Sequence, residues 1–329
     1  MKKNIALVTG GFTGESVISL KSAEVIDSNL DREKFNVYKI IITSDSWFYS
    51  DVKGDKYEVN KNNFSLDTGA EVITFDCVFI GLHGSPGEDG KLQGYFDMIG
   101  IPYTTCDATT SAITMNKGYT KAVVNGVTDL NIARSVQLFS NEPEAPGQLL
   151  SQLRLPLFIK PNNGGSSIGM SKVKEAGEIP EALSKAFRED SQVLVEEFVK
   201  GREFTIGVFN GYEGIKVLPA TEIVTSKEFF DFEAKYTSGV TEEITPGRMS
   251  AEEKSRVEAI VQEAYKKLNC KGVVRIDYIL EEETGKFFFI EVNTEPGQTE
   301  NSIIPQQVRA IGRTIKDFYS ELIEVALKS

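Results

Sequence analysis

The chain has 329 residues, a length that suggests two or three subdomains rather than one small core. Its hydrophobic content of 40% and charged content of 26% are typical of a soluble globular protein. The formal net charge of −12 argues against a general nucleic-acid partner. No apolar run approaches the roughly 18 residues of a membrane span, and the opening MKKNIALVTGG is too short in apolar residues for a signal peptide. We therefore expect a cytoplasmic protein with no membrane contact.

The first part of the chain alternates between buried strands and helices. Residues 5–8, 37–43 and 77–82 are apolar runs of strand length. A helix is expected after the turn TGGFTGES, and another over residues 92–99. This alternation predicts a parallel α/β layer over residues 1–105.

Two further units follow. Residues 106–195 contain an expected helix at 111–124, the strand LPLFIKP, the loop NNGGSSIGM, a charged helix and the strand QVLVEEF. Residues 196–329 contain EFTIGVF, IKVLPATEI, a helix opened by the capping box of Ser250 and Glu253, and the hairpin VVRIDYILEEETGKFFFIEVN. The cysteines at 77, 106 and 270 are widely separated and are expected to be buried reduced thiols.

The hairpin carries polar side chains in an apolar setting. Period-2 alternation puts Arg275 and Asp277 on one face of the first strand, and Glu291 and Asn293 on one face of the second. If the strands align these faces, Asp277, Glu291 and Asn293 form a set of hard oxygen ligands that suits Mg²⁺. The alternative is that Arg275 simply pairs with Asp277 or Glu291 on a solvated face.

Three other features point to a bound ligand, although each also has a structural explanation. The Gly/Ser loop after Lys160 can bring backbone N–H groups and charge to a phosphate, but flexible surface turns have the same composition. Taken alone, Lys117 in TMNKGYTK is typical of a lysine on the surface of a helix. His83, the only histidine, ends a buried strand and enters a glycine-rich loop, where open α/β sheets place ligands; a structural histidine is the alternative.

Taken in chain order, nine stretches resemble the D-alanine–D-alanine ligases of the ATP-grasp superfamily. They are GGFTGESVISLKSA, HGSPGEDGKLQG, TMNKGYTK, FIKPNNGGSSIGMSKV, VEEFVKGREFTIGV, LPATEI, FFDFEAKYTSG, RIDYIL and IEVNTEPGQTENSIIP. The resemblance implies a mixed α/β and α+β protein: a Rossmann-like parallel α/β domain at 1–105, then a two-lobed ATP-grasp fold. The small central lobe is expected at 106–195, and the lobe with the metal and catalytic site at 196–329.

The resemblance also implies the ligands and their residues. Residues matching ATP contacts are Lys117, Lys160, Glu196, Glu197, Val199, Glu203 and, in a lid loop at 225–247, Lys235. Asp277, Glu291 and Asn293 match the ligands of two Mg²⁺ ions, or of Mn²⁺ in their place. Residues matching catalytic groups are Glu15, Ser166, Tyr236, Arg275 and Gly297, while His83 and Ser302 match substrate contacts. A homodimer is implied as well.

The implied activity is an ATP-dependent ligation of two D-alanines through a D-alanyl phosphate, releasing ADP and phosphate, for peptidoglycan precursor synthesis. Ser16 and Val17 depart from the usual Arg-Glu pair, and Gln298 replaces the usual Met or Phe. Ligation of D-alanine to D-serine or D-lactate is the alternative; Tyr236 favours a dipeptide product and so speaks against D-lactate, but it does not decide against D-serine. Two alternatives come from other classes: a nucleotide-binding regulator without catalysis, and an NAD-dependent dehydrogenase built on TGGFTGE, which lacks GxGxxG spacing.

Overall fold

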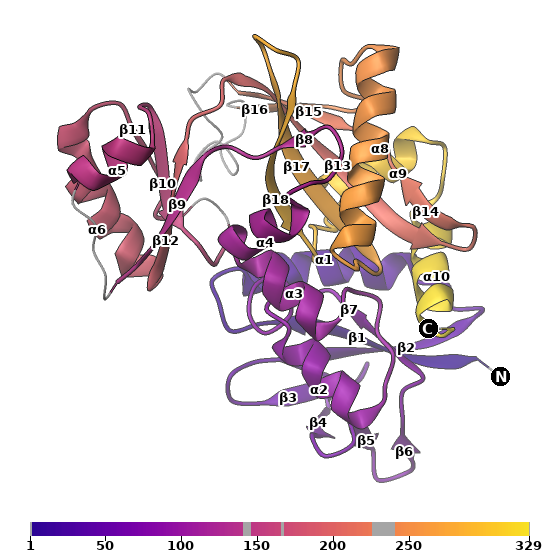
Figure 1. The fold of residues 1–329 in the computed structure, drawn as a ribbon. Helices are drawn as coiled ribbons and strands as arrows, with labels where there is room; N and C mark the ends of the chain where they lie inside the picture. Colours follow the sequence, from indigo (N-terminus) through magenta and orange to yellow (C-terminus); the bar gives the residue numbers. More distant parts are fainter. Residues whose placement is uncertain (1, 141–145, 166–167, 226–240, 329) are drawn as a thin grey trace.

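The computed structural model describes residues 2–140, 146–165, 168–225 and 241–328 (Figure 1). Three sheets organise these residues, and each contributes to one central cleft. Across the described ranges, no helix combines the length and the apolar character needed to cross a bilayer.

The N-terminal sheet has the order β6-β5-β4-β3-β2-β1-β7. Its centre is parallel, as expected: β1 (Lys3–Gly10) lies between β2 (Phe35–Ile42) and β7 (Cys77–Ile80). The other four strands extend it in antiparallel fashion, which differs from the expectation of a wholly parallel layer: β3 (Trp47–Ser50), β4 (Lys56–Asn60), β5 (Ser65–Asp67) and β6 (Val72–Ile73). Their connections are too short for the crossover that parallel neighbours require.

Two helices join this sheet to the rest of the molecule. α1 (Ser16–Asn29) and α10 (Ile315–Ala326) share one core cluster with residues of β1 and of the third sheet. Ala23 and Ile26 of α1 are fully buried in it, beside Phe318 of α10. In Figure 1, α1 lies between the N-terminal sheet and the third sheet. α2 (Lys91–Ile99) packs on the N-terminal sheet and confirms the expected helix.

The middle sheet is antiparallel, with the order β11-β10-β12-β9. Its strands are β9 (Ser135–Phe139), β10 (Leu157–Pro161), β11 (Ser171–Val173) and β12 (Gln192–Glu197). The helices α5 (Pro146–Gln152) and α6 (Ile179–Glu189) pack on this sheet (Figure 1), and the short 3-10 helix η1 (Ala176–Glu178) leads directly into α6.

The helix expected over 111–124 is two helices. α3 (Ala108–Met115) and α4 (Lys117–Val124) are separated by Asn116, whose backbone is extended and whose side chain accepts a hydrogen bond from the N–H of Tyr119. Asparagine is a favoured N-cap because it offers the first turn an acceptor, so a new helix starts here. The domain boundaries at 105/106 and 195/196 remain predictions.

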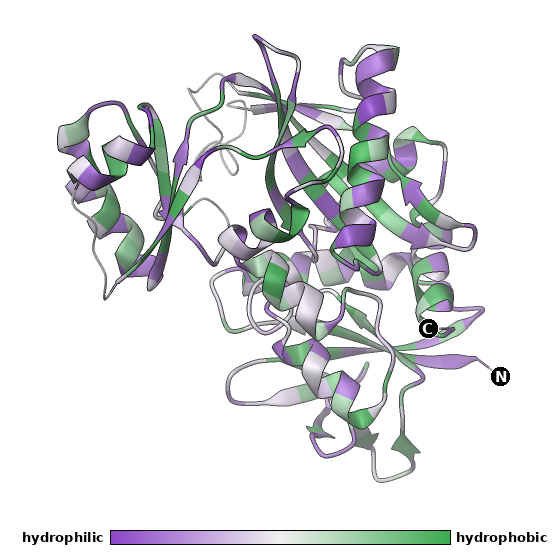
Figure 2. Cartoon of the chain, in the orientation of Figure 1, coloured by the Kyte–Doolittle hydropathy of each residue, from purple (hydrophilic) through white to green (hydrophobic). Residues whose placement is uncertain are grey.

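The third sheet has the order β16-β15-β13-β17-β18-β8, with β14 paired to β13. Its strands are β8 (Leu130–Asn131), β13 (Gly201–Gly211), β14 (Gly214–Val217), β15 (Thr221–Thr225), β16 (Thr241–Ile244), β17 (Val273–Glu281) and β18 (Phe287–Asn293). One face packs on α8 (Ala251–Lys267), whose capping box of Ser250 and Glu253 is present as predicted. Figure 2 shows hydrophobic residues alternating with hydrophilic ones along these strands, and the opposite face borders the cleft.

The three cysteines are free and buried, as expected from the sequence. Burial raises the pKa of the Cys77 thiol to about 12, which keeps it protonated and unreactive. Helix α9 (Ile303–Ala310) starts beside the cleft.

Candidate active site

A single cleft of about 1960 Å³ gathers residues from all three sheets. Every predicted site residue that the structure describes lines it: Glu15, His83, Lys117, Lys160, Glu196, Glu197, Val199, Glu203, Arg275, Asp277, Glu291, Asn293, Gly297 and Ser302. Ser166, Lys235 and Tyr236, with most of the expected lid loop, lie outside the described residues.

The β17–β18 hairpin places the predicted metal ligands side by side. Asp277 is the register partner of Glu291, and Arg275 is the partner of Asn293. The register then shifts, because Tyr278 pairs with Phe289 and leaves Ile290 as an extra residue in β18. Strict alternation along β18 would have turned Phe289 to the same face as the polar residues; the bulge turns it into the core instead.

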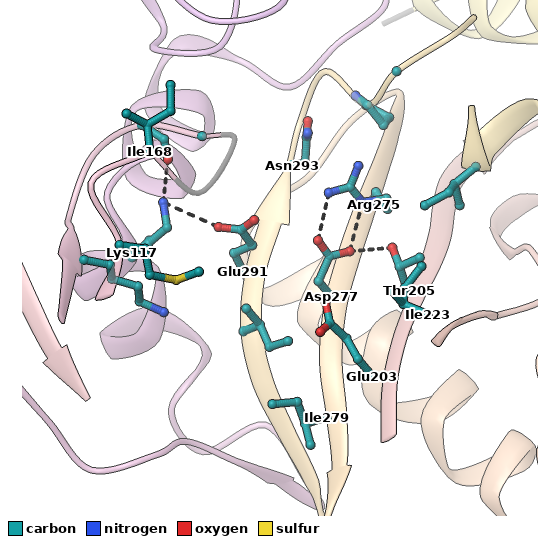
Figure 3. A pocket seen from close by; sticks show the side chains of 18 of the residues that line it. Lys117, Ile168, Glu203, Thr205, Ile223, Arg275, Asp277, Ile279, Glu291 and Asn293 are labelled. Carbon is teal, nitrogen blue, oxygen red and sulfur yellow. Dashed lines mark hydrogen bonds and ion pairs between the residues drawn. The ribbon is translucent and has the colours of Figure 1, made fainter. Parts of the chain in front are cut away.

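Three hydrogen bonds from neighbouring side chains hold Asp277 in place (Figure 3). Arg275 donates two hydrogen bonds to it, from Nε to Oδ1 at 2.9 Å and from Nη2 to Oδ2 at 2.8 Å. The hydroxyl of Thr205, its partner across the β13–β17 ladder, donates to Oδ1 as well. The Arg275–Asp277 pairing that we considered as an alternative is therefore present, but it lies in the cleft rather than on a solvated face.

The donor set of the hairpin fits a hard divalent cation. It offers the carboxylates of Asp277 and Glu291 and the amide of Asn293, which are the oxygen ligands that Mg²⁺ prefers. Within the described part of the chain, no cluster of three or more His, Cys, Asp or Glu side chains has the geometry of a metal site. The predicted set includes only two carboxylates, so substrate phosphate oxygens would need to complete the coordination.

Lys117 occupies the first position of α4 and points at the hairpin. Its Nζ donates to the carbonyl of Gly164 in the Gly/Ser loop at 2.5 Å and lies 3.4 Å from Oε2 of Glu291 (Figure 3). A cation in the first turn of a helix is unfavourable with respect to the helix dipole, and this side chain is also only 10% exposed. The carboxylate of Glu291 offsets part of this cost, and the position also favours a bound anion.

Lys160 and Glu196 lie on the neighbouring strands β10 and β12. Lys160 Nζ is 3.5 Å from Oε2 of Glu196, and the same oxygen forms an ion pair with Lys121 of α4. Burial lowers the pKa of Lys121 to about 8, although the nearby Glu196 opposes that shift. Burial would raise the pKa of Glu196, but the two lysines outweigh it and lower this pKa. The sequence reasoning missed Lys121, although its spacing of four residues from Lys117 put both on one helix face.

His83 is tied into the structure through both ring nitrogens. The carbonyl oxygen of Glu295 can only accept, so Nδ1 donates to it at 2.8 Å; Nε2 then accepts from the hydroxyl of Ser22 at 2.9 Å. Burial lowers the pKa of His83 and favours this neutral ring. His83 lines the cleft as predicted, and it also fastens the turn before Pro296 to α1.

Glu15 lies between two glycine-rich loops. A Cβ on Gly84 would be 2.7 Å from its Oε2, and one on Gly165 would be 3.3 Å from its Oε1. Near it, Glu88 accepts a hydrogen bond from the N–H of Gly84 at 2.8 Å. Burial, with a contribution from Glu15, raises the pKa of Glu88 to about 8. Sequence reasoning missed Glu88, even though it stands in the quoted HGSPGEDGKLQG stretch.

Gly297 and Ser302 meet at the start of α9. A Cβ on Gly297 would lie 2.9 Å from Oγ of Ser302, so only glycine fits without displacing the hydroxyl. Thr299 donates its N–H to that oxygen at 3.0 Å. Ser302 is the N-cap residue of α9 without capping it through its side chain, and a helix N-terminus favours a negatively charged group.

An acidic residue with two arginines lies at another edge of the cleft. Glu222 accepts hydrogen bonds from Nε of Arg202 at 3.1 Å and from Nε of Arg248 at 2.7 Å. Burial would raise the pKa of Glu222, but the hydrogen bonds from Arg248 and Arg202 lower it to about 2. Sequence reasoning missed this cluster because Arg248 is 26 residues away from Glu222 and only the sheet brings them together.

Comparisons with known proteins agree with this geometry. A model described as the D-ala D-ala ligase N-terminus matches residues 4–106, and one described as the D-ala D-ala ligase C-terminus matches residues 126–324. The D-alanine–D-alanine ligase of Parabacteroides distasonis is 44% identical, over 100% of this chain and 99% of that protein. The one of Bacteroides fragilis is 45% identical, over 98% and 99%.

Among solved structures, ligases of D-alanine are again similar to this chain. The VanG D-Ala:D-Ser ligase from Enterococcus faecalis has a TM-score of 0.89 at 33% identity, over 99% of this chain and 100% of that one. The D-alanine–D-alanine ligase from Bacillus anthracis complexed with ATP has a TM-score of 0.79 at 28% identity, over 99% and 98%.

The three sheets and the cleft between them are those of an enzyme with the ATP-grasp fold. Within that class, the chain belongs to the D-alanine–D-alanine ligase family. The fold class and the family expected from the sequence are therefore confirmed.

Proposed function

We propose that this enzyme joins two D-alanines into D-alanyl-D-alanine at the expense of ATP, releasing ADP and phosphate, for peptidoglycan precursor synthesis. The observation that carries the proposal is the cleft itself. Two lysines and the Gly/Ser loop line it together with the acidic hairpin, so a polyphosphate and its cation would find both kinds of partner there. The names of the relatives support the choice of D-alanine.

The first step activates a poor electrophile. A carboxylate does not react with an amine at neutral pH, so the γ-phosphoryl group of ATP is transferred to one D-alanine to give an acyl phosphate. Lys117 and Lys160 would bind the phosphates, and Glu196, Glu197, Val199 and Glu203 would bind the base and ribose. Asp277, Glu291 and Asn293 would hold Mg²⁺, which when bound neutralises phosphate charge. Positioning and charge neutralisation are the main contributions in such a transfer.

The second step forms the amide bond. The amine of the second D-alanine attacks the acyl phosphate, and the tetrahedral carbon carries an oxyanion until phosphate leaves. Arg275 is aligned by Asp277 and would stabilise this oxyanion together with the N–H of Gly297. Glu15 and His83 lie where the first D-alanine would bind, while Ser302 and the N-terminus of α9 suit the carboxylate of the second.

Other parts of the proposal rest on the family resemblance. We infer that Lys235 and Tyr236 close over the substrates and exclude water, and that Ser166 belongs to the same hydrogen-bonded set as Glu15 and Tyr236. Magnesium or manganese as the metal, a cytoplasmic location and a homodimer are inferred on the same basis.

A second acceptor has specific support. The structure with a TM-score of 0.89 is named a D-Ala:D-Ser ligase, so D-serine is the competing second substrate. It would use the same cleft and the same acyl phosphate, and the difference would lie in the side-chain space around the second amino acid.

One experiment separates these possibilities. Phosphate release with ATP and Mg²⁺ is measured against D-alanine, L-alanine, D-serine and D-lactate, singly and with D-alanine, and the products are identified by mass spectrometry. D-alanyl-D-alanine as the main product supports the proposal. Predominant D-alanyl-D-serine from an equimolar mixture supports the alternative. Turnover with L-alanine but not with D-alanine contradicts both.

A further inference from the structure

One carboxylate in the cleft is shared by two lysines of different accessibility. Oε2 of Glu196 forms ion pairs with Lys121 from α4 and with Lys160 from β10. Glu196 and Lys160 both line the cleft, whereas Lys121 does not and its side chain is only 4% exposed. Lys121 therefore contacts the ligand space only through Glu196.

The two lysines respond differently to an entering anion. Lys160 lies at the cleft surface and 3.5 Å from Glu196, so phosphate oxygens can compete for it. Lys121 cannot reach the cleft, and leaving it without a partner in a buried place would be costly. Once a nucleotide is bound, Lys121 is accordingly the counter-ion that stays with Glu196.

An ionised, fixed carboxylate can only accept hydrogen bonds. It therefore selects a ligand that presents N–H groups and disfavours one that presents a carbonyl at the same place. Purine bases differ in this respect at C6, where adenine carries an amino group and hypoxanthine carries a carbonyl oxygen. Hypoxanthine also carries a hydrogen on N1, which is an acceptor in adenine, whereas the shapes of the two bases are almost the same.

We propose that Lys121 is a positioning residue that keeps Glu196 oriented as an acceptor for the 6-amino group of the base, so that Lys160 is free to bind phosphate. The inference rests on the proposed use of ATP and adds the residue that governs base selection. Lys121 acts entirely through Glu196, and it contacts neither the nucleotide nor the amino acids.

The test compares ADP with inosine diphosphate, whose bases differ at C6 and at the adjacent N1. The comparison uses the change in their affinity ratio between variants, because the N1 difference is common to all of them. Binding of ADP and of inosine diphosphate, each with Mg²⁺ and without amino acids, is measured by titration calorimetry for the wild type, Lys121→Met and Lys121→Arg. We expect Lys121→Met to reduce the preference for ADP by roughly tenfold or more, the range for losing a hydrogen bond to a charged group. Lys121→Arg keeps the ion pair and should retain most of the preference.

A double variant separates a role through Glu196 from a general structural role. Glu196→Gln should itself lose most of the preference, because an amide offers both a donor and an acceptor. Adding Lys121→Met to Glu196→Gln should then change the ADP-to-inosine-diphosphate ratio no further. A uniform loss of affinity for both nucleotides in Lys121→Met, or an unchanged ratio, would overturn the inference. Absence of nucleotide binding by the folded wild type would instead overturn the proposed function.

Discussion

Asp277 of β17 lies directly opposite Glu291 of β18, and the register of the two strands shifts by one residue immediately beyond this pair. Because of this shift, one short strand can direct polar side chains to the cleft and phenylalanines to the core. The carboxylates face the cleft, while Phe287 and Phe289 are fully buried in the core on the other side. The cost of placing acidic groups beside phenylalanines is thereby limited, because only the polar face meets solvent and ligand.

Glu291→Gln should strongly reduce catalysis without unfolding the protein. The amide keeps the shape of the side chain but removes the charge that would bind Mg²⁺, so we expect ATP-dependent phosphate release to fall by at least about a hundredfold. Glu258→Gln, on α8 and outside the cleft, is the charge-matched control. Rates are measured over a range of Mg²⁺ concentrations, with circular dichroism to verify folding. Wild-type turnover in Glu291→Gln would refute the metal assignment.

Arg275→Lys should lower turnover by roughly a hundredfold, because a single ammonium cannot replace both the planar donors toward Asp277 and the contact to the oxyanion. The informative readout is kcat at saturating Mg²⁺. If Arg275 only orients Asp277, more Mg²⁺ should restore the rate. A rate that stays low at saturation, with unchanged ATP affinity, assigns Arg275 to the oxyanion.

Gly297→Ala should be destabilising and should slow the reaction. Its new Cβ would lie 2.9 Å from Oγ of Ser302, and overpacking of this kind typically costs about 1–3 kcal/mol. Combining it with Ser302→Ala removes that oxygen, so the thermal unfolding temperature should recover while activity stays low. If the double variant is no more stable than Gly297→Ala alone, the steric explanation is wrong.

Glu222 should contribute to stability in a pH-dependent way. Its pKa is about 2 in the folded protein against an ordinary 4.5, so its contribution is fully present above pH 4.5 and is lost as the pH falls toward 2. The full contribution is up to about 3 kcal/mol. Urea unfolding at pH 6, 4.5 and 3 should show the wild type losing its advantage over Glu222→Gln as the pH decreases. A constant difference would contradict the pairing with Arg202 and Arg248.

His83 should remain neutral at pH values where a free histidine is charged. Burial lowers its pKa below the ordinary 6.5, so the unfolded chain binds a proton that the folded chain does not, and stability falls as the pH drops below about 6.5. Because the chain has one histidine, a single set of imidazole NMR signals reports this directly. The spectrum should show a proton on Nδ1; a ring that titrates normally would disprove the two hydrogen bonds.

The sequence predicted the units that depend on local pattern. The hairpin, the capping box of Ser250 and the polar face of β17 follow from alternation and capping rules, and the structure has them. The bulge at Ile290 was not predictable, because four consecutive apolar residues in FFFIEVN do not show which one is left out of the ladder. The break at Asn116 was missed because the apolar pattern continues across it.

Residues brought together from distant parts of the chain were the hardest to predict. From the sequence alone, Lys121 is typical of a surface lysine. Its partner Glu196 lies 75 residues later, on β12, and only the fold brings the two together. Nothing in the sequence distinguishes Thr205 from other strand threonines; its position opposite Asp277 depends on the β13–β17 register. Period-2 and period-3.6 patterns carry no information about which strand edges meet, so these contacts follow only from the assembled sheets.

The placement of Lys117 and Lys121 about one helical turn apart determines which mutations this part of the protein can tolerate. About 6 Å of helix rise separates Lys117 from Lys121, four residues at roughly 1.5 Å each, and backbone hydrogen bonds rather than side-chain packing set this spacing. Point substitutions elsewhere in the core can accumulate without altering that spacing, whereas inserting or deleting a single residue between the two lysines would rotate one of them by about 100° away from its carboxylate. This short stretch should consequently tolerate variation in residue type far better than variation in length.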